Sequence, residues 1–422
     1  SQICTAGFCN VSSVSIYDKP TYPHRGLLID SGRRIIPVPV IYAILDGMAA
    51  LRLNALHLHL TDWAGVRWKS SSFPRLNFKK RYYSKLDLHK LDLFATDRGI
   101  TIYPEIDVPG HAHCFASVEK GEFLFCDTKK WQLFNDPGGT TLSNLKVLVR
   151  EISSLFPNSP IIHIGGDETE DKGSCNKENF GALTLALQNE VSKVHHRRAV
   201  VWNEVPEVLS ALNQKTGTIA QCWSPTCNIS RLTSEGIFTI MSRYDSFYLD
   251  HTSTTCSLMD IASQRCLWDD IARNNGDTVY TRFLLGGEAT MWTDEYCPHD
   301  KCVGHADTWG GKIGWLFHKR HDALFAQNFL SVIFPRLAAA AGTFYRFNST
   351  LSKEMFLRRY LAASYRLDRR IYQEMQKHRH EHNLGQNLYT CPTVDCSGCT
   401  MTHRCDVTWE EYFRSAGVKI AK

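Results

Sequence analysis

The sequence predicts an α/β fold, a (β/α)8 TIM barrel followed by a helical, cysteine-rich C-terminal extension. Eight short apolar runs of the β type recur along the 422 residues, and helical segments lie between them. The runs are mostly apolar rather than alternating, which is typical of parallel strands buried on both faces. An open doubly wound sheet is the alternative, but no G-x-G-x-x-G sequence follows the first run.

The predicted elements follow one another in the order that a barrel requires. The eight strands are Arg25–Ser31, Ala55–Asp62, Thr101–Val108, Ile161–Glu168, Ala199–Val205, Gly217–Trp223, Phe238–Tyr244 and Phe283–Trp292. The helices between them include Pro39–Leu51, Lys85–Arg98, Leu142–Leu155 and Phe180–His195. After the eighth strand we expect an apolar helix around Ala323–Ala341, a charged helix at about Lys353–His380 and a stapled cap at Cys391–Cys405. We therefore place the barrel at residues 21–345, an N-terminal segment at 1–20 and the extension at 346–422.

Composition and charge limit the class of protein. With 43% hydrophobic and 11% aromatic residues, the chain can bury a large core. The net charge of +5 and the scattered basic residues argue against binding to nucleic acid. Since no stretch approaches the roughly 20 apolar residues that a membrane span needs, we expect no such span. The oligomeric state stays open, a homodimer included.

Fifteen cysteines, many of them close in sequence, are typical of disulfides formed in an oxidising compartment. The expected local pairs are Cys4 with Cys9, Cys114 with Cys126, Cys222 with Cys227, Cys256 with Cys266, and Cys297 with Cys302. With two more bridges among Cys391, Cys396, Cys399 and Cys405, Cys175 is left over. The tail spacing also resembles a zinc cluster, but in this compartment we expect no metal and no cofactor.

N-glycosylation sequons begin at Asn10, Asn228 and Asn348, which favours the same secretory route. We therefore expect a secreted or lysosomal protein. No signal peptide opens the chain, which we interpret as a mature or excised form.

Residues 161–168 read I-I-H-I-G-G-D-E, an apolar run followed by two glycines and two carboxylates. The glycines allow a tight backbone turn close to a ligand. Asp167 and Glu168 then lie just past the strand end, where an α/β barrel keeps its chemistry.

Carboxylates and aromatic residues also end most of the other predicted strands. They are Asp62, then Glu105, Asp107 and His111, then Trp202 and Glu204, then Trp223, then Tyr248 and Asp250, and finally Trp292, whereas Arg25 opens the first strand. Aromatic rings stack on the apolar faces of pyranoses, and carboxylates accept hydrogen bonds from hydroxyl groups. The pattern therefore predicts a sugar-binding site on one face of the barrel.

Cleavage of a glycosidic bond usually needs two carboxylates on opposite sides of it. Asp167 and Glu168 are neighbours in sequence and cannot easily flank one bond. Two alternatives stay open on this ground, a distant second carboxylate such as Glu288 or a nucleophile supplied by the substrate.

Five motifs together resemble the glycoside hydrolase family 20 β-N-acetylhexosaminidases. They are R-G-L-L-I-D-S (25–31), H-L-H-L-T-D (57–62), P-E-I-D-V-P-G-H (104–111), the octapeptide at 161–168 and W-T-D-E-Y (292–296). The resemblance covers residues 20 to 345, with about one motif per strand and in the right order. It implies an enzyme acting on N-acetylhexosamine-terminated glycans, in which the 2-acetamido group of the substrate attacks its own anomeric carbon.

The resemblance also implies a role for individual residues. Glu168 would be the general acid/base, and Asp167 would orient and polarise the acetamido nitrogen. Arg25 and Asp250 would hold sugar hydroxyls, and Tyr248 would bond to the acetamido oxygen. The remaining matches are Trp202, Trp223 and Trp292 as aromatic walls, His111 and Asp62 as supports of the acid, Glu105 and Asp107 behind the substrate-contacting residues, and Glu204 and Glu288 as structural groups.

The chain departs from the family in three places. Trp63 stands where members usually carry a second aspartate after Asp62, and the late W-x-E motif reads Trp292-Thr293-Asp294-Glu295, of which we favour Glu295 as the hydroxyl ligand. Members also commonly carry an α/β domain before the first strand, which we interpret as absent, cleaved or outside this chain.

Three functions follow from these patterns. The first is an exo-acting enzyme with a pocket closed around one sugar, whose Glu168 has a raised pKa because a general acid must hold its proton. The second is a catalytically silent sugar-binding protein on the same barrel. The third is a conventional retaining glycosidase that uses Glu168 and Glu288.

Overall fold

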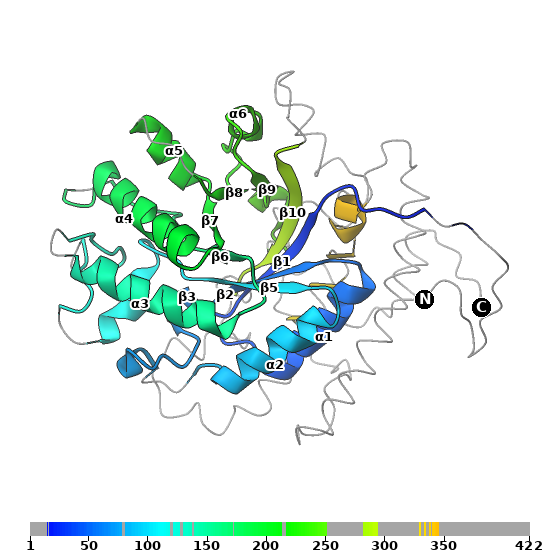
Figure 1. Ribbon diagram of the computed structural model, residues 1–422, viewed down its shortest axis with the longest axis horizontal. Helices are drawn as coiled ribbons and strands as arrows, with labels where there is room; N and C mark the ends of the chain where they lie inside the picture. Colours follow the sequence, from blue (N-terminus) through cyan, green and yellow to red (C-terminus); the bar gives the residue numbers. More distant parts are fainter. Residues whose placement is uncertain are drawn as a thin grey trace, which may run out of the picture.

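The computed structural model places eight parallel strands in a closed barrel (Figure 1). The structure describes residues 15 and 17–250, apart from gaps at 78–80, 119–120, 127–129, 137–138, 172 and 213–216, and then 282–293, 329–330, 333–334, 337–338 and 340–345. Around the barrel the strands follow the order β1-β10-β9-β8-β7-β6-β5-β2. Their bounds are β1 His24–Asp30, β2 Ala55–His59, β5 Thr101–Glu105, β6 Ile161–His163, β7 Arg198–Trp202, β8 Ile219–Cys222, β9 Thr239–Met241 and β10 Leu284–Met291. The predicted (β/α)8 barrel is confirmed.

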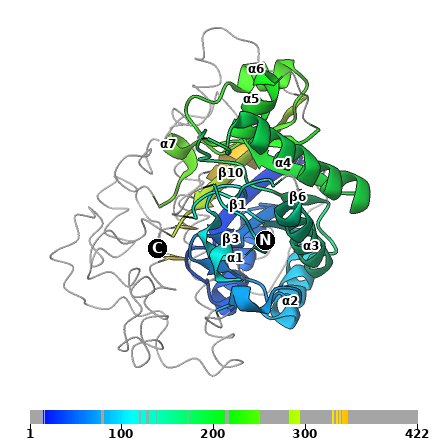
Figure 2. The same cartoon turned by 90° about the vertical axis from the view of Figure 1, so that its left-hand side faces the viewer.

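Helices cover the outside of the barrel, and Figure 2 shows α2, α3 and α4 around the strands. The α-helices are α1 Val38–Ala50, α2 Lys85–Thr96, α3 Thr140–Leu155, α4 Lys177–Asn189, α5 Glu204–Ala211, α6 Ile229–Ser234 and α7 Tyr244–Phe247. Shorter elements are the hairpin β3 Thr61–Asp62 with β4 Gly65–Val66, the 3-10 turns η1 Pro74–Asn77 and η2 Ala112–Ser117, and the π-turn η3 Glu190–Val194. The four helices predicted by range are all present, within three residues at their starts, and the fourth ends in η3.

Local sequence explains where two of these helices begin. Pro37 and Pro39 stand at the start of α1, where a missing N–H costs nothing. Ser84 and Asp87 form a capping box at the start of α2, each side chain accepting from the other's backbone N–H. The two helices pack against each other, and α2 packs against β5.

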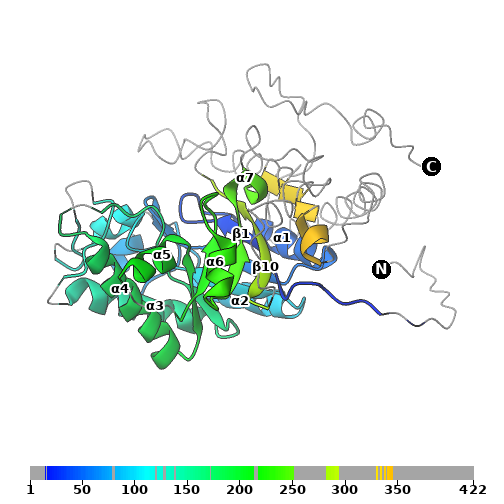
Figure 3. The same ribbon diagram turned by 90° about the horizontal axis from the view of Figure 1, so that it is seen from above.

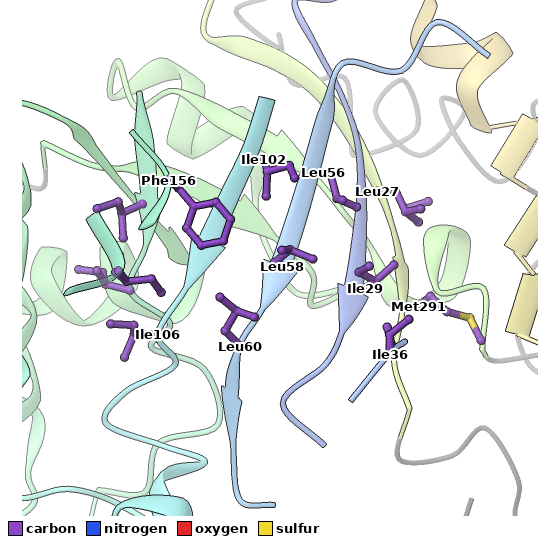
Figure 4. Packing of buried hydrophobic residues seen from close by; sticks show 14 of the residues in the cluster. Leu27, Ile29, Ile36, Leu56, Leu58, Leu60, Ile102, Ile106, Phe156 and Met291 are labelled. Carbon is purple, nitrogen blue, oxygen red and sulfur yellow. The ribbon is translucent and has the colours of Figure 1, made fainter. Parts of the chain in front are cut away.

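Side chains alternate between the two faces of each strand. On β1, Leu27 and Ile29 belong to the large core between strands and helices, whereas Leu28 belongs to a separate buried cluster that includes Trp202. Figure 4 shows this outer layer, with Leu56 and Leu58 of β2 beside Leu27 and Ile29. The alternate positions of β2 and β5, His57, His59, Tyr103 and Glu105, are fully or almost fully buried inside. The part of the barrel interior beside β2 and β5 is therefore polar.

Several strands end earlier than the sequence predicts. The strand β6 contains only three residues, because Gly165 and Gly166 follow with φ of +70° and +108° and bend the chain away. The strand β7 likewise stops at Trp202, where α5 begins two residues later. Figure 3 shows α7 beside β10, which pairs with β1 and β9 and closes the ring. Asp107, Asp167 and Glu168 therefore lie in the loops that follow the strands, whereas Glu105 is the last residue of β5.

Two disulfides join described cysteines, Cys126–Cys175 and Cys222–Cys227. The second was predicted, but the predicted pair of Cys114 with Cys126 is wrong, and Cys175 is not left over. Cys114 is a free thiol buried in η2. The loop after β6 brings Cys175 to within a Cα–Cα distance of 5.7 Å of Cys126, so the fold rather than the sequence spacing decides this pair.

Other predictions fall outside the described residues. They are the remaining cysteine pairs, the sequons at Asn10 and Asn348, the helix at Lys353–His380, the cap at Cys391–Cys405 and most of residues 1–20. Residues described between 329 and 345 are largely helical and buried, in agreement with the end of the predicted apolar helix. In the described part of the chain, no helix combines the length and apolar character that crossing a membrane requires.

Candidate active site

The turn after β6 sets the positions of Asp167 and Glu168. A Cβ atom at Gly165 would lie 2.1 Å from Asp107 Oδ1, and one at Gly166 would lie 2.4 Å from Val205 Cγ2, so neither position accepts a side chain. The backbone N–H of Gly165 donates to His163 Nδ1 at 3.0 Å. Glu168 itself has a φ of +46°, an unusual conformation for a residue with a Cβ atom. The two carboxylates are thus held at the carboxyl end of β6 by a strained and crowded turn.

A chain of charged groups connects Glu168 to Asp62. His111 Nε2 lies 3.3 Å from Glu168 Oε2, and its Nδ1 lies 3.4 Å from Asp62 Oδ1. Burial alone would lower the pKa of His111, but the charge of Asp167 and hydrogen bonds to Asp62 and Glu168 raise it to about 12. Burial opposes ionisation of Asp62 as well, but Arg33 and His111 hold the pKa of its carboxyl well below its usual range. At neutral pH His111 is therefore a cation between two carboxylates.

The predicted rise in the pKa of Glu168 is wrong for this structure. The hydrogen bond from His111 lowers the pKa of Glu168, and this outweighs the opposing effect of partial burial. The side chain of Glu168 is 54% exposed, so water still solvates its charged form. The sequence predicted that His111 lies beside Glu168, and the structure places it there, but the effect of its charge on the pKa of Glu168 was not foreseen.

Asp167 lies beside a second buried carboxyl group, that of Asp107. Burial and the charge of Asp167 raise the pKa of Asp107 well above its usual range, whereas the pKa of Asp167 is raised less because burial is opposed by the charge of His111. Asp107 therefore holds the proton of the pair, and Asp167 is the carboxylate. The side chain of Asp167 is 14% exposed, which leaves it accessible to a ligand.

Four aromatic side chains form one wall near these carboxylates. Trp202, Tyr248 and Trp292 form a buried cluster, with ring centroids of Trp202 and Trp292 6.1 Å apart, and Trp223 packs against it. Glu105 accepts a hydrogen bond from Trp202 Nε1 at 2.9 Å. The sequence thus predicted correctly that the three tryptophans and the tyrosine gather at one end of the barrel.

Glu204 holds the fourth ring in place. Both of its carboxylate oxygens accept from Trp223 Nε1, at 2.9 and 3.0 Å. Burial and the charge of Asp167 raise the pKa of Glu204 to about 8. The charge of Asp167 therefore acts on Glu204, for which the sequence suggested only a structural role.

Arg25 does not reach this site, and its predicted role is wrong. It lies at the amino end of β1, at the opposite end of the barrel, where its guanidinium donates to the carbonyls of Arg52 and Tyr22 at 2.9 and 2.7 Å. The carboxyl end of the same strand carries Arg33 instead. Its guanidinium lies 3.0 Å from Asp62 Oδ2 and 5.0 Å from the ring centroid of Trp292. The signal in the sequence was the Arg33-Arg34 pair directly after the predicted strand.

The other predicted carboxylates divide into three cases. Asp250 lies at the wall, where its Oδ1 accepts from the backbone N–H of Trp292 at 3.2 Å. Glu295 and Asp294 lie outside the described residues. Glu288 is fully buried inside the barrel, with its oxygens bonded to His24, His57, Tyr103 and Gln221. It does not face the pocket with Glu168.

Groups of potential metal ligands also occur inside the described part of the barrel. One comprises His57, Glu105 and His163, and two others surround Asp107, with His59 and Asp62 or with His111 and Asp167. Glu105 has its oxygens 2.9 Å from His163 Nδ1 and 3.2 Å from His57 Nε2, so the carboxylate already has buried side-chain partners. The first group is therefore explained as a buried hydrogen-bonded network.

Comparisons with known proteins agree with this geometry. The family model for the glycosyl hydrolase family 20 catalytic domain matches residues 22–305. The β-hexosaminidase subunit beta of Homo sapiens is 30% identical over 315 residues, covering 68% of this chain and 55% of that protein. The corresponding subunit of Mus musculus is 29% identical over 315 residues, with 68% and 57% covered. The chain thus spans just over half the length of these curated relatives.

Solved structures show the same fold. The Streptomyces plicatus N-acetyl-β-hexosaminidase in complex with Thio-NAglucal has a TM-score of 0.64 at 22% identity, covering 82% of this chain and 69% of that one. A glycoside hydrolase family 20 β-N-acetylglucosaminidase has a TM-score of 0.65 at 22% identity, covering 86% and 78%. Since the family model includes all eight barrel strands and most of the chain, this protein belongs to glycosyl hydrolase family 20.

Proposed function

We propose that the chain is an exo-acting β-N-acetylhexosaminidase, which removes terminal β-linked GlcNAc or GalNAc from glycans or chitooligosaccharides. The observation that carries this proposal is the pair Asp167 and Glu168 at the end of β6, with His111 and Asp62 behind the acid. The relatives named β-hexosaminidase support the same reaction class.

The identity of the nucleophile follows from the available carboxylates. A conventional retaining glycosidase needs a second carboxylate about 5–5.5 Å from the acid, on the other side of the scissile bond. Glu288 is fully buried and bonded inside the barrel. We therefore assign the nucleophile to the substrate, whose 2-acetamido oxygen attacks C1 and gives an oxazolinium intermediate with retention.

Asp167 is suited to assist this attack. As the acetamido oxygen bonds to C1, positive charge develops on the amide nitrogen, and a carboxylate beside its N–H stabilises that charge. The neighbouring Asp107 holds the proton of the pair, which leaves Asp167 ionised. Tyr248 has a pKa well above its usual range because it is buried, so it stays neutral and can donate to the acetamido oxygen.

Glu168 protonates the glycosidic oxygen and, as a carboxylate, then takes a proton from the water that opens the intermediate. Its pKa is lowered in the free protein, but a bound sugar would displace the water that solvates its 54% exposed side chain. Desolvation raises the pKa of a carboxyl group. Substrate binding therefore prepares Glu168 for the first step.

The remaining residues bind the terminal sugar. Trp202, Trp223 and Trp292 wall the acetamido group and the ring, and Arg33 takes the role that the sequence had suggested for Arg25. Asp250 and Glu295 would accept hydrogen bonds from the far hydroxyls. A ring enclosed in this way has no room for a further sugar, so cleavage would proceed from the non-reducing end.

A secretory location, either secreted or lysosomal, accompanies this proposal. The two described disulfides and the sequon at Asn228, at the start of α6, support it.

The experiment is hydrolysis of 4-nitrophenyl β-GlcNAc beside the matched β-glucoside, which has a 2-hydroxyl group. We expect cleavage of the first alone. Comparable cleavage of both would indicate a conventional two-carboxylate glycosidase. Binding without cleavage of either would indicate a silent sugar-binding protein. A time course on chitohexaose, with monomer as the first product, would separately support the exo pocket.

A further inference from the structure

A hollow of about 510 Å³ lies beside the proposed site, outside the acid and its supports. It is bounded by the β3–β4 hairpin and the turns η1 and η2, and its volume is within the range of pockets for small ligands. None of its lining residues belongs to the aromatic wall or to the pair Asp167 and Glu168.

Three segments connect the hollow directly with the acid. In each, one residue supports Glu168 or His111, and a residue one or two positions away lines the hollow. Asp62 contacts His111, and Trp63 lines the hollow. His111 contacts Glu168, and His113 lines the hollow. Trp131 packs on the ring of His111 at 4.8 Å, and Lys130 lines the hollow.

The lining of the hollow is cationic. It includes Arg67, Arg81 and Lys130 in addition to His113, and no aspartate or glutamate is among the lining residues that the structure describes. Arg67 is fixed there, because its guanidinium donates to the carbonyls of Ser31, Gly32, Arg33 and Arg81. A concave surface lined by charges of one sign attracts an ion of the opposite sign, here an anion.

Trp63 adds an aromatic surface to this hollow. It is the residue that replaces an acid in the sequence pattern discussed above, so the replacement removes a negative charge and supplies a ring. Its backbone N–H is held by Asp62 Oδ1, and its side chain is partly exposed. An aromatic ring beside cations is suited to a sugar that carries an acidic group.

We propose that this hollow binds an acidic sugar of the leaving group, one bearing a carboxylate or a sulfate ester, next to the bond that Glu168 protonates. This inference rests on the proposed function, since it describes the sugar on the far side of the cleaved bond. The protein would then prefer substrates in which the terminal N-acetylhexosamine is linked to an acidic sugar.

The test compares three disaccharides in which GlcNAc is β-linked to glucose, to glucuronate or to glucose 6-sulfate. In the unmodified protein, we expect kcat/KM to be higher for at least one acidic disaccharide than for the neutral one, and this preference should weaken with salt. A preference for the glucuronate disaccharide would show that the hollow binds a carboxylate, and a preference for the glucose 6-sulfate disaccharide would show that it binds a sulfate ester. No preference in either acidic arm would overturn the proposal.

Substitutions of residues that line the hollow test whether the hollow causes the preference for acidic disaccharides. Lys130→Glu and Arg81→Glu should each lower the acidic-to-neutral ratio by about fivefold, the size of one partly exposed charge interaction. Lys90→Glu, on the exposed face of α2, is the matched control and should leave the ratio unchanged. Hydrolysis of 4-nitrophenyl β-GlcNAc should change little in all of them, since its small leaving group does not extend into the hollow. A ratio that does not respond to Lys130→Glu or Arg81→Glu would contradict the assignment.

The two proposals can fail separately. If 4-nitrophenyl β-GlcNAc is not cleaved, the proposed function fails, and the hollow is then tested by calorimetric binding of the same three disaccharides to the Glu168→Gln variant. Tighter binding of an acidic disaccharide, lost with Lys130→Glu, would still support the hollow. Equal binding of all three would refute it.

Discussion

Replacing His111 with glutamine should move the pH dependence of the reaction toward higher pH. In the structure, the His111 imidazolium lies 3.3 Å from Glu168 Oε2 and lowers the pKa of Glu168. A neutral glutamine removes that positive charge. The carboxylate form of Glu168 then loses stabilisation, and its pKa rises toward the ordinary value.

The size of the shift follows from the exposure of the acid. A hydrogen bond between charged groups contributes about 1.5–3 kcal/mol when it is buried. Because the side chain of Glu168 is 54% exposed, solvent screening reduces this to about 1 kcal/mol, which corresponds to about 0.7 pKa units. A general acid works only in its protonated form. The basic limb of the pH profile should therefore move upward by about 0.5–1 unit in His111→Gln.

The assay is kcat/KM against pH with chitobiose, whose sugar leaving group needs protonation. His195→Gln, a histidine outside the site that interacts with Glu190, is the matched control and should leave the profile in place. The absolute rate of His111→Gln should fall, because Glu168 also loses a support for its position. A basic limb that stays fixed or moves to lower pH would refute the assigned coupling between His111 and Glu168.

Three further predictions concern the acid, the interior and the disulfides. Glu168→Gln should slow cleavage of chitobiose by about 10²–10⁴-fold. It should slow cleavage of an activated 4-nitrophenyl substrate much less, because that leaving group departs without a proton. Equal losses on both substrates would contradict the role of Glu168 as the acid. Glu288→Gln should destabilise the protein by about 3 kcal/mol in thermal unfolding, because His57 and His24 lose a buried anionic partner. The folded variant should still require the 2-acetamido group of the substrate. Replacing Cys126 and Cys175 with alanine should lower the free energy of unfolding by about 3–4 kcal/mol, because this disulfide joins residues separated by 49 positions. Removing Cys222–Cys227, with a separation of 5, should lower it less. The reverse order in denaturant unfolding would contradict this account.

The barrel could be predicted because each strand is encoded locally. An apolar run such as Ile161–Ile164 has few alternatives to a buried strand, and eight of them in series define a closed parallel sheet. The tryptophans and Tyr248 were placed correctly for the same reason, since the carboxyl ends of parallel strands meet on one face.

The arginine near the candidate site shows where prediction from a motif fails. Arg25 and Arg33 flank the same strand, and only the strand's direction decides which end faces the site. Arg25 opens β1 and therefore lies at the wrong end, although it is part of a family-like motif. The direction of β1 along the chain places Arg33, and not Arg25, at the carboxyl end of the strand.

The pKa of Glu168 and the partner of Cys126 depend on contacts that the sequence does not contain. His111 precedes Glu168 by 57 residues, and Cys175 follows Cys126 by 49. Both contacts form through loops after neighbouring strands, whose paths depend on the tertiary fold. Spacing along the chain therefore predicts the wrong disulfide, and the requirement that a general acid hold its proton predicts the wrong direction of the pKa shift.

The most direct test of the central claim is a series of 4-nitrophenyl β-glycosides whose 2-acyl group is acetyl, fluoroacetyl, difluoroacetyl or trifluoroacetyl. Each fluorine withdraws electrons from the acyl oxygen and weakens it as a nucleophile. If the substrate supplies the nucleophile, kcat/KM should fall steeply and steadily along the series while Asp167 and Glu168 are intact. Rates that change little with fluorination would show that a carboxylate of the protein attacks the sugar, and would contradict the account.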